Sequence, residues 1–393
     1  MTAPDWRPYA EKLAGELEAM GCFKAGWQKE AFFDTPRHLF IDQYYEHKDD
    51  GEVLVADLEP LTDARLKTMY SDDGLQIRQP PDHSAASQVS LIFQMLDDLE
   101  LEPGNKVLEI GTGTGWNTAL LARGSGDGRL IYSIDINPEL IDAAKRHLAA
   151  ASIEGVNLRA GDGGYGWPEA APFDRIIVTV GSPDIPRHWT EQLAEGGVLV
   201  VPLETGGIGN PVLRLRKENG QLRGGFTQYS GFYPMRGDFS LPKPEGSDER
   251  NALTQRLLAS GERTELALPE PVPLNWQVRV QFPFFLYLVG APFQTMNVCN
   301  SELVAHGMTV VFLDAESESA LAVGGPEPVV WVYGDTASGQ RFVTKMEEWI
   351  ALGRPDFSDY KVGLVARNAR AHKQNEWIDR RQHATLKISL VGG

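Results

Sequence analysis

The sequence predicts an α/β fold in which a doubly wound parallel sheet precedes an additional C-terminal α+β domain. Between residues 107 and 203, short apolar strand patterns alternate with helical patterns, which is typical of a parallel sheet with helices on both faces. A turn with three glycines follows the first of these strands, and prolines become frequent after residue 240. We expect an N-terminal helical and irregular segment over residues 1–80, a main domain over 81–240 and an accessory domain over 241–393.

The composition limits the partners that this chain of 393 residues can take. Its net charge of −17 argues against nucleic acid, whose phosphates an acidic surface would repel. The apolar run from Phe282 to Val289 is far too short to span a bilayer, and the first residues carry no apolar signal core. Two cysteines, Cys22 and Cys299, do not make a disulfide framework. We therefore expect a cytoplasmic protein with reduced thiols that binds neither membranes nor nucleic acid.

The stretch from Asn105 to Asp135 predicts a nucleoside site. An apolar strand leads into Gly111, Gly113 and Gly115, and a helix and a second strand then end at Asp135. Glycine reaches positive φ without steric cost, and its missing side chain lets a ligand lie against the backbone. An acidic residue about 20 positions on can accept both hydroxyl hydrogens of a ribose. The unit therefore indicates a nucleoside at the carboxyl ends of parallel strands; the alternative is a glycine-rich turn that binds no ligand.

The residues around the glycines separate two cofactor classes. The dinucleotide fingerprint G-x-G-x-x-G requires glycine at position 116, where this chain has Trp116. A nicotinamide oxidoreductase is therefore disfavoured, and the sequence also lacks a proton-transfer dyad for it. The run E-x-G-x-G-x-G, which begins at Glu109, instead resembles the S-adenosylmethionine motif of class I methyltransferases. In that arrangement Glu109 would lie near the ammonium end of the ligand. We expect no metal site.

The chain before the glycine turn predicts mostly helices. Helical periodicity over residues 5–20 and 27–33 indicates two helices that pack on the main domain. His38 lies beside a proline turn with no partner visible in the sequence, so we interpret it as structural rather than catalytic. Residues 46–82 are polar and irregular. Ser87 precedes a further amphipathic helix and is placed to cap its N-terminus.

The chain after the second strand continues the alternation. Asn137 is placed to cap a helix with a proline in its first turn. A third strand ends in Gly161-Asp162-Gly163, where Asp162 could accept a hydrogen bond from an adenine amino group; the alternative is an ordinary Asp-Gly turn. The remaining strand patterns lie at residues 173–180, 198–203, 212–216 and 222–229, the last two as a hairpin around Asn219-Gly220.

The accessory domain shows no catalytic constellation and no internal repeat. Its aromatic residues between 282 and 287 are typical of a core, although a role in peptide docking stays open. A helix is expected at about residues 341–352. Strands are expected at residues 277–290, 307–313, 329–333, 361–366 and 385–391.

From Pro36 to Gly237 the chain resembles the protein-L-isoaspartate (D-aspartate) O-methyltransferase family. The resemblance covers about half the chain. It implies a Rossmann-like class I methyltransferase fold that binds S-adenosyl-L-methionine and releases S-adenosyl-L-homocysteine. The matching pieces are PRHLF from Pro36, Ser87-Gln88, VLEIGTGTGW from Val107, Gly161-Asp162-Gly163, VTVGSPDIP from Val178, QLAEGGVLVVP from Gln192 and FYPMRG from Phe232.

The resemblance also implies which residues form the site. Asp135 would bind the ribose and Asp162 the adenine. The active-site serine of the family carries over to Ser87, which would position the reacting carboxylate. The residues implied to contact the donor are Ser84, Ala86, Gln88, Glu109, Gly111, Thr112, Gly113, Thr114, Gly115, Asp135, Ile136, Gly161, Asp162 and Gly163.

Two departures from the family pattern bear on the substrate. The family has Thr-Ile before its serine and a proline two positions after it, where this chain has Ala85-Ala86 and Val89. The ordinary repair enzyme also lacks the large C-terminal domain. Long members of this kind resemble those of actinobacterial pathways to ribosomal peptide natural products, such as lanthipeptides and graspetides. There the enzyme methylates an aspartate of a modified precursor, and the ester collapses to a succinimide or hydrolyses to isoaspartate.

The expected function is therefore carboxyl O-methylation of an aspartate in a modified ribosomal peptide, for which a ring-bearing precursor is one option. Repair of L-isoaspartyl residues in damaged proteins is the first alternative. A non-catalytic peptide-binding protein with a degenerate methyltransferase fold is the second. The chemistry needs no general base, because a carboxylate with a reference pKa near 4 is already ionised at neutral pH. Catalysis would rest on holding that carboxylate in line with the methyl group.

Overall fold

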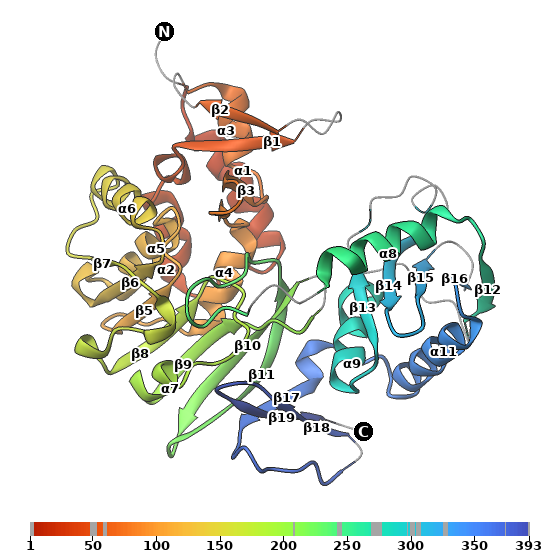
Figure 1. Cartoon of the computed structure of the whole chain (residues 1–393). Helices are drawn as coiled ribbons and strands as arrows, with labels where there is room; N and C mark the ends of the chain where they lie inside the picture. Colours follow the sequence, from red (N-terminus) through yellow and green to blue (C-terminus); the bar gives the residue numbers. More distant parts are fainter. Residues whose placement is uncertain are drawn as a thin grey trace. The chain divides into compact units, whose positions relative to one another are not determined.

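The computed structural model describes residues 4–47, 53–57, 61–206, 209–241, 246–268, 277–296, 298, 303, 308–324, 329–373 and 375–391 (Figure 1). The chain forms two compact units, which are described separately. The first unit contains the residues up to Val201 together with 214–222 and 233–239, and the second contains 202–213, 223–232 and the residues from Ser240. Separate domains over 1–80, 81–240 and 241–393 stay a prediction. Cys22 is buried and not in a disulfide, whereas Cys299 lies outside the described residues.

Five parallel strands form the sheet of the first unit in the order β9-β8-β5-β6-β7. The chain adds two strands on one side of β5 and then two on the other, so the strand order reverses beside β5. Open α/β sheets bind ligands at this point, at the carboxyl ends of the strands. The expected doubly wound sheet is confirmed. The strands are β5 (Val107–Ile110), β6 (Ile131–Asp135), β7 (Asn157–Ala160), β8 (Phe173–Val178) and β9 (Leu193–Pro202).

Helices connect these strands. The helix after β6 begins as expected: the side chain of Asn137 accepts a hydrogen bond from the N–H of Glu139 at 2.9 Å, and Pro138 is its first residue. Helix α5 begins at Trp116, directly after the glycine turn. The helices are α4 (Val89–Leu99), α5 (Trp116–Ser125), α6 (Pro138–Ala150) and α7 (Arg187–Gln192), with short 3-10 turns at Gly128–Leu130, Gly163–Tyr165 and Pro168–Ala170.

The N-terminal part of the first unit is more regular than expected. The two predicted helices are present, but residues 46–82 also contain a hairpin strand, a helix and a third strand, so the expectation of an irregular segment is wrong. Strands β1 and β2 pair antiparallel, as do β3 and β4. The elements are α1 (Arg7–Ala19), α2 (Gly26–Asp34), a 3-10 turn at Arg37–Phe40, β1 (Gln43–His47), β2 (Val53–Asp57), α3 (Asp63–Met69), β3 (Leu75–Arg78) and β4 (Ser84–Ala86).

The predicted hairpin is formed by β10 (Asn210–Glu218) and β11 (Gln221–Ser230), whose residues are divided between the two units. Its turn residues Asn219 and Gly220 both have positive φ, at 52° and 72°, as a tight hairpin turn requires. In the second unit the strand order continues from β11 through β17 and β19 to β18. These strands are β17 (Tyr360–Leu364), β18 (Glu376–Arg380) and β19 (Thr385–Leu390), and a 3-10 turn at Phe357–Asp359 precedes β17.

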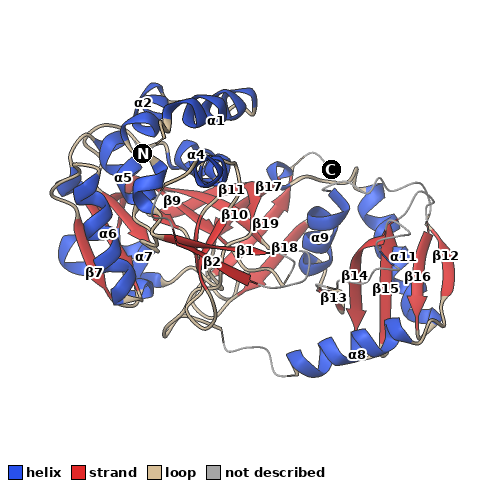
Figure 2. Cartoon of the chain, turned by 90° about the horizontal axis from the view of Figure 1, so that it is seen from above, coloured by secondary structure: helices blue, strands red, loops and turns tan. Residues whose placement is uncertain are grey.

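A second sheet in the same unit has five antiparallel strands in the order β12-β16-β15-β14-β13. Helices lie on both of its faces (Figure 2). One face packs Phe312 and Val332 against α9 and α11, and the other packs Ala322 and Trp331 against α8. The elements are α8 (Ser247–Ala259), β12 (Thr264–Ala267), α9 (Phe282–Leu288), β13 (Phe293–Met296), β14 (Met308–Asp314), β15 (Ser319–Gly324), β16 (Val329–Tyr333) and α11 (Thr336–Ala351).

Residues 277–290 do not form the strand that the sequence predicts. Gln277–Gln281 form a π-helical turn and Phe282–Leu288 form α9. Pro283 lies in the first turn of α9, where a missing N–H costs no hydrogen bond. The rings of Phe282 and Trp349 pack at 5.4 Å in the core, so tertiary packing decides the conformation of this apolar run. No helix among the described residues is long and apolar enough to cross a bilayer.

Candidate functional site

The glycine turn between β5 and α5 has positive φ at all three glycines: 102° at Gly111, 53° at Gly113 and 85° at Gly115. Residues with a side chain rarely adopt such values. Packing adds a second reason at the outer two positions. A Cβ on Gly111 would lie 2.5 Å from the hydroxyl oxygen of Thr179, and one on Gly115 would lie 3.0 Å from the Cβ of Ala144. These two glycines are required by the protein itself.

Gly113 has open space beside it. Among the described residues, a Cβ there would meet nothing within 4 Å except the hydroxyl oxygen of Ser84, at 4.0 Å. Packing therefore does not explain the missing side chain at this position. The turn leaves room for a ligand against the backbone of Gly113, on the side where Ser84 of β4 lies. This is the room that the sequence predicts for the donor.

Asp135 is buried at the end of β6 and joins the turn to the next helix. Its side chain is 8% exposed, and its two oxygens accept hydrogen bonds of 2.9 Å from the N–H groups of Gly113 and Asn137. Burial raises the pKa of Asp135, and the two backbone N–H groups act against this rise. Each carboxylate oxygen has further lone pairs. The side chain can therefore accept hydrogen bonds from a ribose while it holds the turn.

The side chain of Glu109 is held by bonds within the protein. Its side chain is fully buried and accepts hydrogen bonds from Asn117 at 2.7 Å, Thr118 at 2.5 Å and Ser133 at 2.6 Å. Burial raises the pKa of Glu109 to about 7, although the three donors act against this rise. The expected contact with the ammonium group of a ligand finds no support in this geometry. Glu109 instead connects β5, α5 and β6 beneath the glycine turn.

Three more residues of the expected donor site lie around the turn. The hydroxyl of Thr112 is 2.7 Å from that of Ser133, and the carbonyl of Thr114 is 2.8 Å from Nδ1 of His147. Both threonines are buried, so they support the turn from the protein side. Ile136 is different, because its side chain is 36% exposed directly after Asp135. An exposed apolar side chain at this edge of the sheet suits the face of an adenine ring.

Asp162 lies where the sequence places the adenine. It accepts hydrogen bonds from the N–H groups of Gly164 at 2.8 Å and Asp238 at 2.6 Å. A Cβ on Gly237, whose φ is 97°, would lie 2.3 Å from Oδ2 of Asp162 and 3.1 Å from Cδ1 of Ile136. Ile136, Asp162 and Gly237 therefore lie together at the carboxyl ends of β6 and β7.

The two glycines beside Asp162 have different roles. A Cβ on Gly163 would lie 2.4 Å from Cγ2 of Ile110, so packing against β5 requires glycine there. A Cβ on Gly161 would meet no described atom within 4 Å. The space beside Gly161 is open, as it is beside Gly113. Both open glycines lie at the carboxyl edge of the sheet.

The segment that carries Ser87 is held by a buried arginine. The guanidinium of Arg37 is buried and its carbon lies 5.6 Å from the ring centre of Trp116 in α5. Burial lowers the pKa of Arg37 to about 10. At distances of 2.8 to 3.4 Å it donates to the backbone carbonyls of Met69, Ser71, Asp73, Ala86 and Ser87. Arg37 thus ties the serine segment to the loop after α3.

Asp72, not Ser87, caps helix α4. The carboxylate of Asp72 accepts hydrogen bonds of 2.7 Å from both the N–H and the hydroxyl of Ser90, and one of 3.1 Å from the side chain of Gln88. The helix begins at Val89 with Gln88 as its flanking residue. The expectation that Ser87 caps this helix is therefore wrong. Ser87 is half-buried, and within the described residues no hydrogen bond of its hydroxyl is found.

The two residues before Ser84 contact the segment from Tyr233 to Arg236. The ring of His83 stacks on that of Tyr233 with centroids 4.8 Å apart, and Asp82 accepts a 2.6 Å hydrogen bond from Arg236. Gly181 and Pro234 form a parallel bridge beside them. His38, in contrast, is engaged with Tyr70 through a 2.8 Å hydrogen bond, and burial lowers its pKa to about 4, as expected of a structural histidine.

Sequence reasoning missed Arg37 and Asp72 as residues of the site. Both act through backbone groups far along the chain, at separations of up to 50 residues, and no local pattern signals such contacts. Among the residues that the structure describes, no group of three His, Cys, Asp or Glu side chains could hold a metal ion. The site therefore consists of an open glycine turn, two strand-end carboxylates and a serine segment placed opposite Gly113.

The family profile described as "Protein-L-isoaspartate(D-aspartate) O-methyltransferase (PCMT)" matches residues 57–237. The chain is 35% identical over 209 residues to a protein-L-isoaspartate O-methyltransferase of Pyrococcus horikoshii, which covers 53% of this chain and 83% of that one. It is 32% identical over 242 residues to the enzyme of that name from Methanopyrus kandleri, covering 61% and 96%.

A solved structure titled protein-L-isoaspartate O-methyltransferase has a similar fold, with a TM-score of 0.53 and 24% identity. The likeness covers 92% of this chain and 97% of that one, which is more than the first unit alone. The second unit therefore also has a counterpart in fold.

Proposed function

The chain belongs to the protein-L-isoaspartate O-methyltransferase family, and on that premise we propose that it methylates the free carboxylate of isoaspartyl residues in peptides and proteins. The cofactor is S-adenosyl-L-methionine and the product S-adenosyl-L-homocysteine. One observation carries the proposal: the open space at Gly113 lies between the glycine turn and β4, within a few residues of Ser87. Donor and acceptor segments thus face each other across one gap.

The donor side consists of residues whose positions suit a nucleoside. Asp135 accepts hydrogen bonds from the ribose hydroxyls, and Ile136 and Asp162 contact the adenine. Gly113 and Gly161 leave the backbone accessible. Glu109 does not touch the cofactor and keeps β5, α5 and β6 in register through its three hydrogen bonds. When bound, S-adenosyl-L-methionine supplies a methyl group on a positively charged sulfur.

The acceptor side consists of the segment from Ser84 to Ser87. Ser87 donates a hydrogen bond to the substrate carboxylate and orients one oxygen toward the methyl carbon. S-adenosyl-L-methionine would supply its methyl group to that oxygen and would be released as a neutral thioether. The carboxylate is already ionised at neutral pH, so the protein moves no proton. Orientation of this kind is worth up to roughly 7–11 kcal/mol in ideal cases.

Formation of S-adenosyl-L-homocysteine tests this proposal. The full chain is incubated with S-adenosyl-L-methionine and one of two peptides of equal sequence, with either L-isoaspartate or aspartate at one position. The isoaspartyl peptide is expected to support turnover well above the background without peptide, and its aspartyl twin is not. If both peptides give only the rate measured without peptide, the proposed activity is excluded.

A second candidate substrate is an ordinary aspartate of a ring-bearing ribosomal peptide, such as a lanthipeptide or graspetide precursor. It is supported by Ala85 and Ala86, which are smaller than the Thr-Ile of the family and leave more room beside Ser87. The second unit does not favour this candidate, because a solved structure named for isoaspartate methylation shares the fold over nearly its whole length. The resulting ester would collapse to a succinimide.

The test of the second candidate uses an aspartyl peptide closed into a ring and its linear twin. Turnover of the ring-bearing peptide without turnover of the linear isoaspartyl peptide would replace the first proposal by the second. Turnover of the linear isoaspartyl peptide alone would exclude the second.

A further inference from the structure

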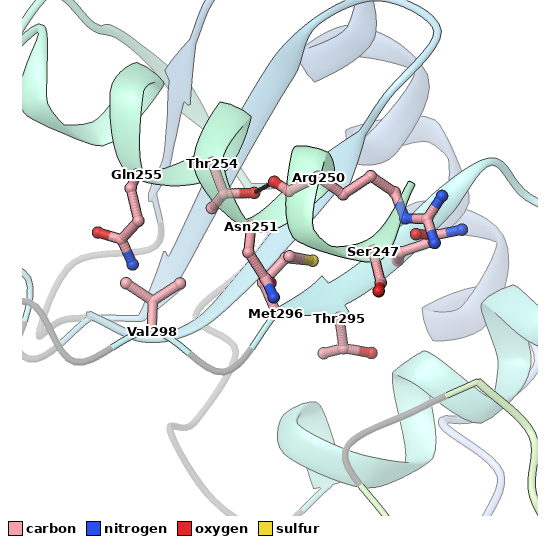
Figure 3. A pocket seen from close by; sticks show the side chains of 9 residues that line it. Ser247, Arg250, Asn251, Thr254, Gln255, Thr295, Met296 and Val298 are labelled. Carbon is pink, nitrogen blue, oxygen red and sulfur yellow. Dashed lines mark hydrogen bonds between the residues drawn. The ribbon is translucent and has the colours of Figure 1, made fainter. Parts of the chain in front are cut away.

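The second unit has a pocket between helix α8 and strand β13 that is large enough for a nucleoside, with a volume of about 370 Å³ (Figure 3). At its wall, the hydroxyl of Thr254 donates a hydrogen bond of 2.8 Å to the backbone carbonyl of Arg250. Its nine described lining residues include no carboxylate that could accept hydrogen bonds from a ribose or an adenine. Among the described residues, the carboxylates that suit an adenosine are Asp135 and Asp162 of the first unit.

Residues 236–239, which we call the clasp, lie at the carboxyl edge of the sheet in the first unit. The chain before them is anchored beyond the end of β8, where the N–H of buried Met235 donates a hydrogen bond of 2.7 Å to the carbonyl of Gly181. The clasp then reaches the end of β7, where Gly237 lies against Asp162. Because the strand order is β8-β5-β6-β7, the chain passes here from the β8 side of the donor site to its β7 side.

The carboxylate of Asp162 is held by two backbone N–H groups. Its Oδ1 accepts a hydrogen bond of 2.8 Å from Gly164, and its Oδ2 accepts one of 2.6 Å from Asp238. Gly164 belongs to the turn after β7, whereas Asp238 belongs to the clasp. One fixed donor on each oxygen orients the carboxylate, and each oxygen keeps a further lone pair. The clasp therefore helps to orient the group that faces the adenine.

Two aromatic residues hold the clasp in place. The hydroxyl of Tyr165 donates a hydrogen bond of 2.8 Å to the side chain of Asp238, and the rings of Tyr165 and Phe239 pack edge to face at 5.0 Å. A Cβ on Gly164 would collide with the ring of Phe239, so this ring covers the turn after β7. Tyr165 ends the 3-10 turn that Asp162 caps. The turn that carries Asp162 thus also grips the clasp.

Gly237 is the position at which the clasp comes nearest to Asp162. Its φ is 97°, which residues with a side chain rarely adopt. A Cβ there would collide with Oδ2 of Asp162 and would lie 3.1 Å from Cδ1 of Ile136. The backbone of the clasp therefore lies directly against both side chains that suit the adenine. Any side chain at this position must displace Asp162 or lift the clasp.

We propose that the clasp makes the donor site selective for a 6-amino purine, with Gly237, Asp238 and Tyr165 as residues that position Asp162. This assignment rests on the proposed function, because S-adenosyl-L-methionine supplies the adenine. A carboxylate accepts hydrogen bonds and does not donate them. The 6-amino group of adenine can donate to Asp162. Hypoxanthine carries a carbonyl oxygen at that position, which only accepts, so an oriented carboxylate rejects it.

Calorimetric titration with two nucleosides tests the proposal without turnover. The full chain is titrated with S-adenosyl-L-homocysteine and with S-inosyl-L-homocysteine, its deaminated twin. The wild-type chain should bind the adenine compound at least about tenfold more tightly, because the twin leaves the carboxylate facing another acceptor. The ratio of the two affinities is the readout. Both ligands are measured on the same variant, so a loss of stability alone does not change this ratio.

Gly237→Ala should lower the affinity ratio several-fold, because the added methyl group displaces Asp162. Gly104→Ala is the matched control: φ at Gly104 is 86°, and a Cβ there would meet no described atom within 4 Å. It shares the backbone strain without the collision and should keep the wild-type ratio. An equal fall of the ratio in both variants would overturn the proposal.

Tyr165→Phe tests the clasp without backbone strain. It removes only the hydroxyl that holds Asp238, and the ratio should fall about threefold. The control is Tyr9→Phe, because the hydroxyl of Tyr9 also donates a 2.8 Å hydrogen bond to an exposed acid, Asp63. Tyr9→Phe should keep the wild-type ratio.

The outcomes separate the clasp from the proposed function. If the wild-type chain binds S-adenosyl-L-homocysteine and the ratio is unchanged in Gly237→Ala and Tyr165→Phe, the role of the clasp is excluded and the proposed function stands. A wild-type ratio near one would also exclude the clasp alone. If the wild-type chain binds neither nucleoside, both the clasp and the proposed function are excluded.

Discussion

The buried guanidinium of Arg37 donates a hydrogen bond of 2.9 Å to the backbone carbonyl of Ser87, fifty residues along the chain. The same group donates to one carbonyl at the end of α3 and to two in the loop after it, and it lies against the ring of Trp116, the first residue of α5. The serine segment and the helix that follows the glycine turn therefore share one rigid contact. This contact explains how Ser87, which directly follows the short strand β4, is held in a fixed position.

Arg37→Lys should lower both stability and turnover. A lysine keeps the charge, but its three N–H groups cannot reproduce the planar fork of the guanidinium. We expect a loss of about 2–3 kcal/mol in the free energy of unfolding, a clear loss of kcat, and unchanged affinity for S-adenosyl-L-homocysteine by calorimetry. Arg129→Lys, at an exposed pair with Asp127, is the matched control and should change neither. Full turnover in Arg37→Lys would show that Ser87 is positioned by other groups.

Ser87→Ala should lower turnover, whereas Asp72→Ala should lower stability. Because Asp72 caps α4, its loss should cost about 1–2 kcal/mol of stability. Ser87→Ala should leave the melting temperature unchanged and lower single-turnover methylation. Thermal melts and single-turnover rates of both variants decide the question. A melting shift in Ser87→Ala as large as that in Asp72→Ala, with full activity, would return Ser87 to a structural role.

Asp135→Ala should weaken cofactor binding. The loss of hydrogen bonds to a charged acceptor costs roughly 1–3 kcal/mol, which is about 5- to 150-fold in affinity. Calorimetric titration with S-adenosyl-L-homocysteine measures it. Glu139→Ala changes an exposed acid in the first turn of α6 and serves as the control, with unchanged affinity expected. Equal affinities of Asp135→Ala and wild type would remove Asp135 from the donor site.

Glu109→Gln should flatten the dependence of stability on pH. The pKa of Glu109 is raised from an ordinary 4.5 to about 7 in the folded chain. Between these values the folded state retains a proton that the unfolded state has lost, so this group lowers the free energy of unfolding as pH rises from about 4.5 to about 7. Above that range the loss is complete. A glutamine is neutral at every pH and can keep the three hydrogen-bond partners. In Glu109→Gln the free energy of unfolding should therefore no longer fall because of this residue as pH rises.

The difference between the wild-type and Glu109→Gln stability curves isolates this group. His38 titrates in the same range with the opposite sign, because its pKa is lowered to about 4 and the unfolded chain binds the proton below its ordinary 6.5. That contribution is common to both chains and cancels in the difference. Urea unfolding at several pH values gives the two curves. Parallel curves between pH 4.5 and 7 would contradict a raised pKa at Glu109.

Local signals explain why much of the site could be predicted from the sequence. The glycine turn and Asp135 lie within one strand–helix–strand unit, where spacing and conformation are set by neighbours in sequence. The start of α6 at Asn137 and the hairpin at Asn219-Gly220 rest on equally local chemistry. The distinction between Gly113 and its two neighbouring glycines was not visible, because it depends on Thr179 and Ala144 from other elements.

Contacts between distant residues explain what the sequence did not predict. The apolar run around Phe282 has the pattern of a strand, yet the core beside Trp349 holds it as α9. Helix α8 was not expected either, because few of its residues are buried. The cap on α4 comes from Asp72, which lies outside the helix and its flanking residues. Tertiary packing decides the conformation of these segments and overrides the local conformational preference of their residues.

The location of the methyl group tests the central claim most directly. The full chain receives S-adenosyl-L-methionine and an equimolar mixture of one peptide with L-isoaspartate and its twin with aspartate, which differ by an isotope label. Tandem mass spectrometry then identifies the esterified residue. The account predicts one added methyl group on the isoaspartyl residue, with the aspartyl twin unmodified. A methyl group on the aspartyl twin alone, or on neither peptide while S-adenosyl-L-homocysteine binds, would contradict it.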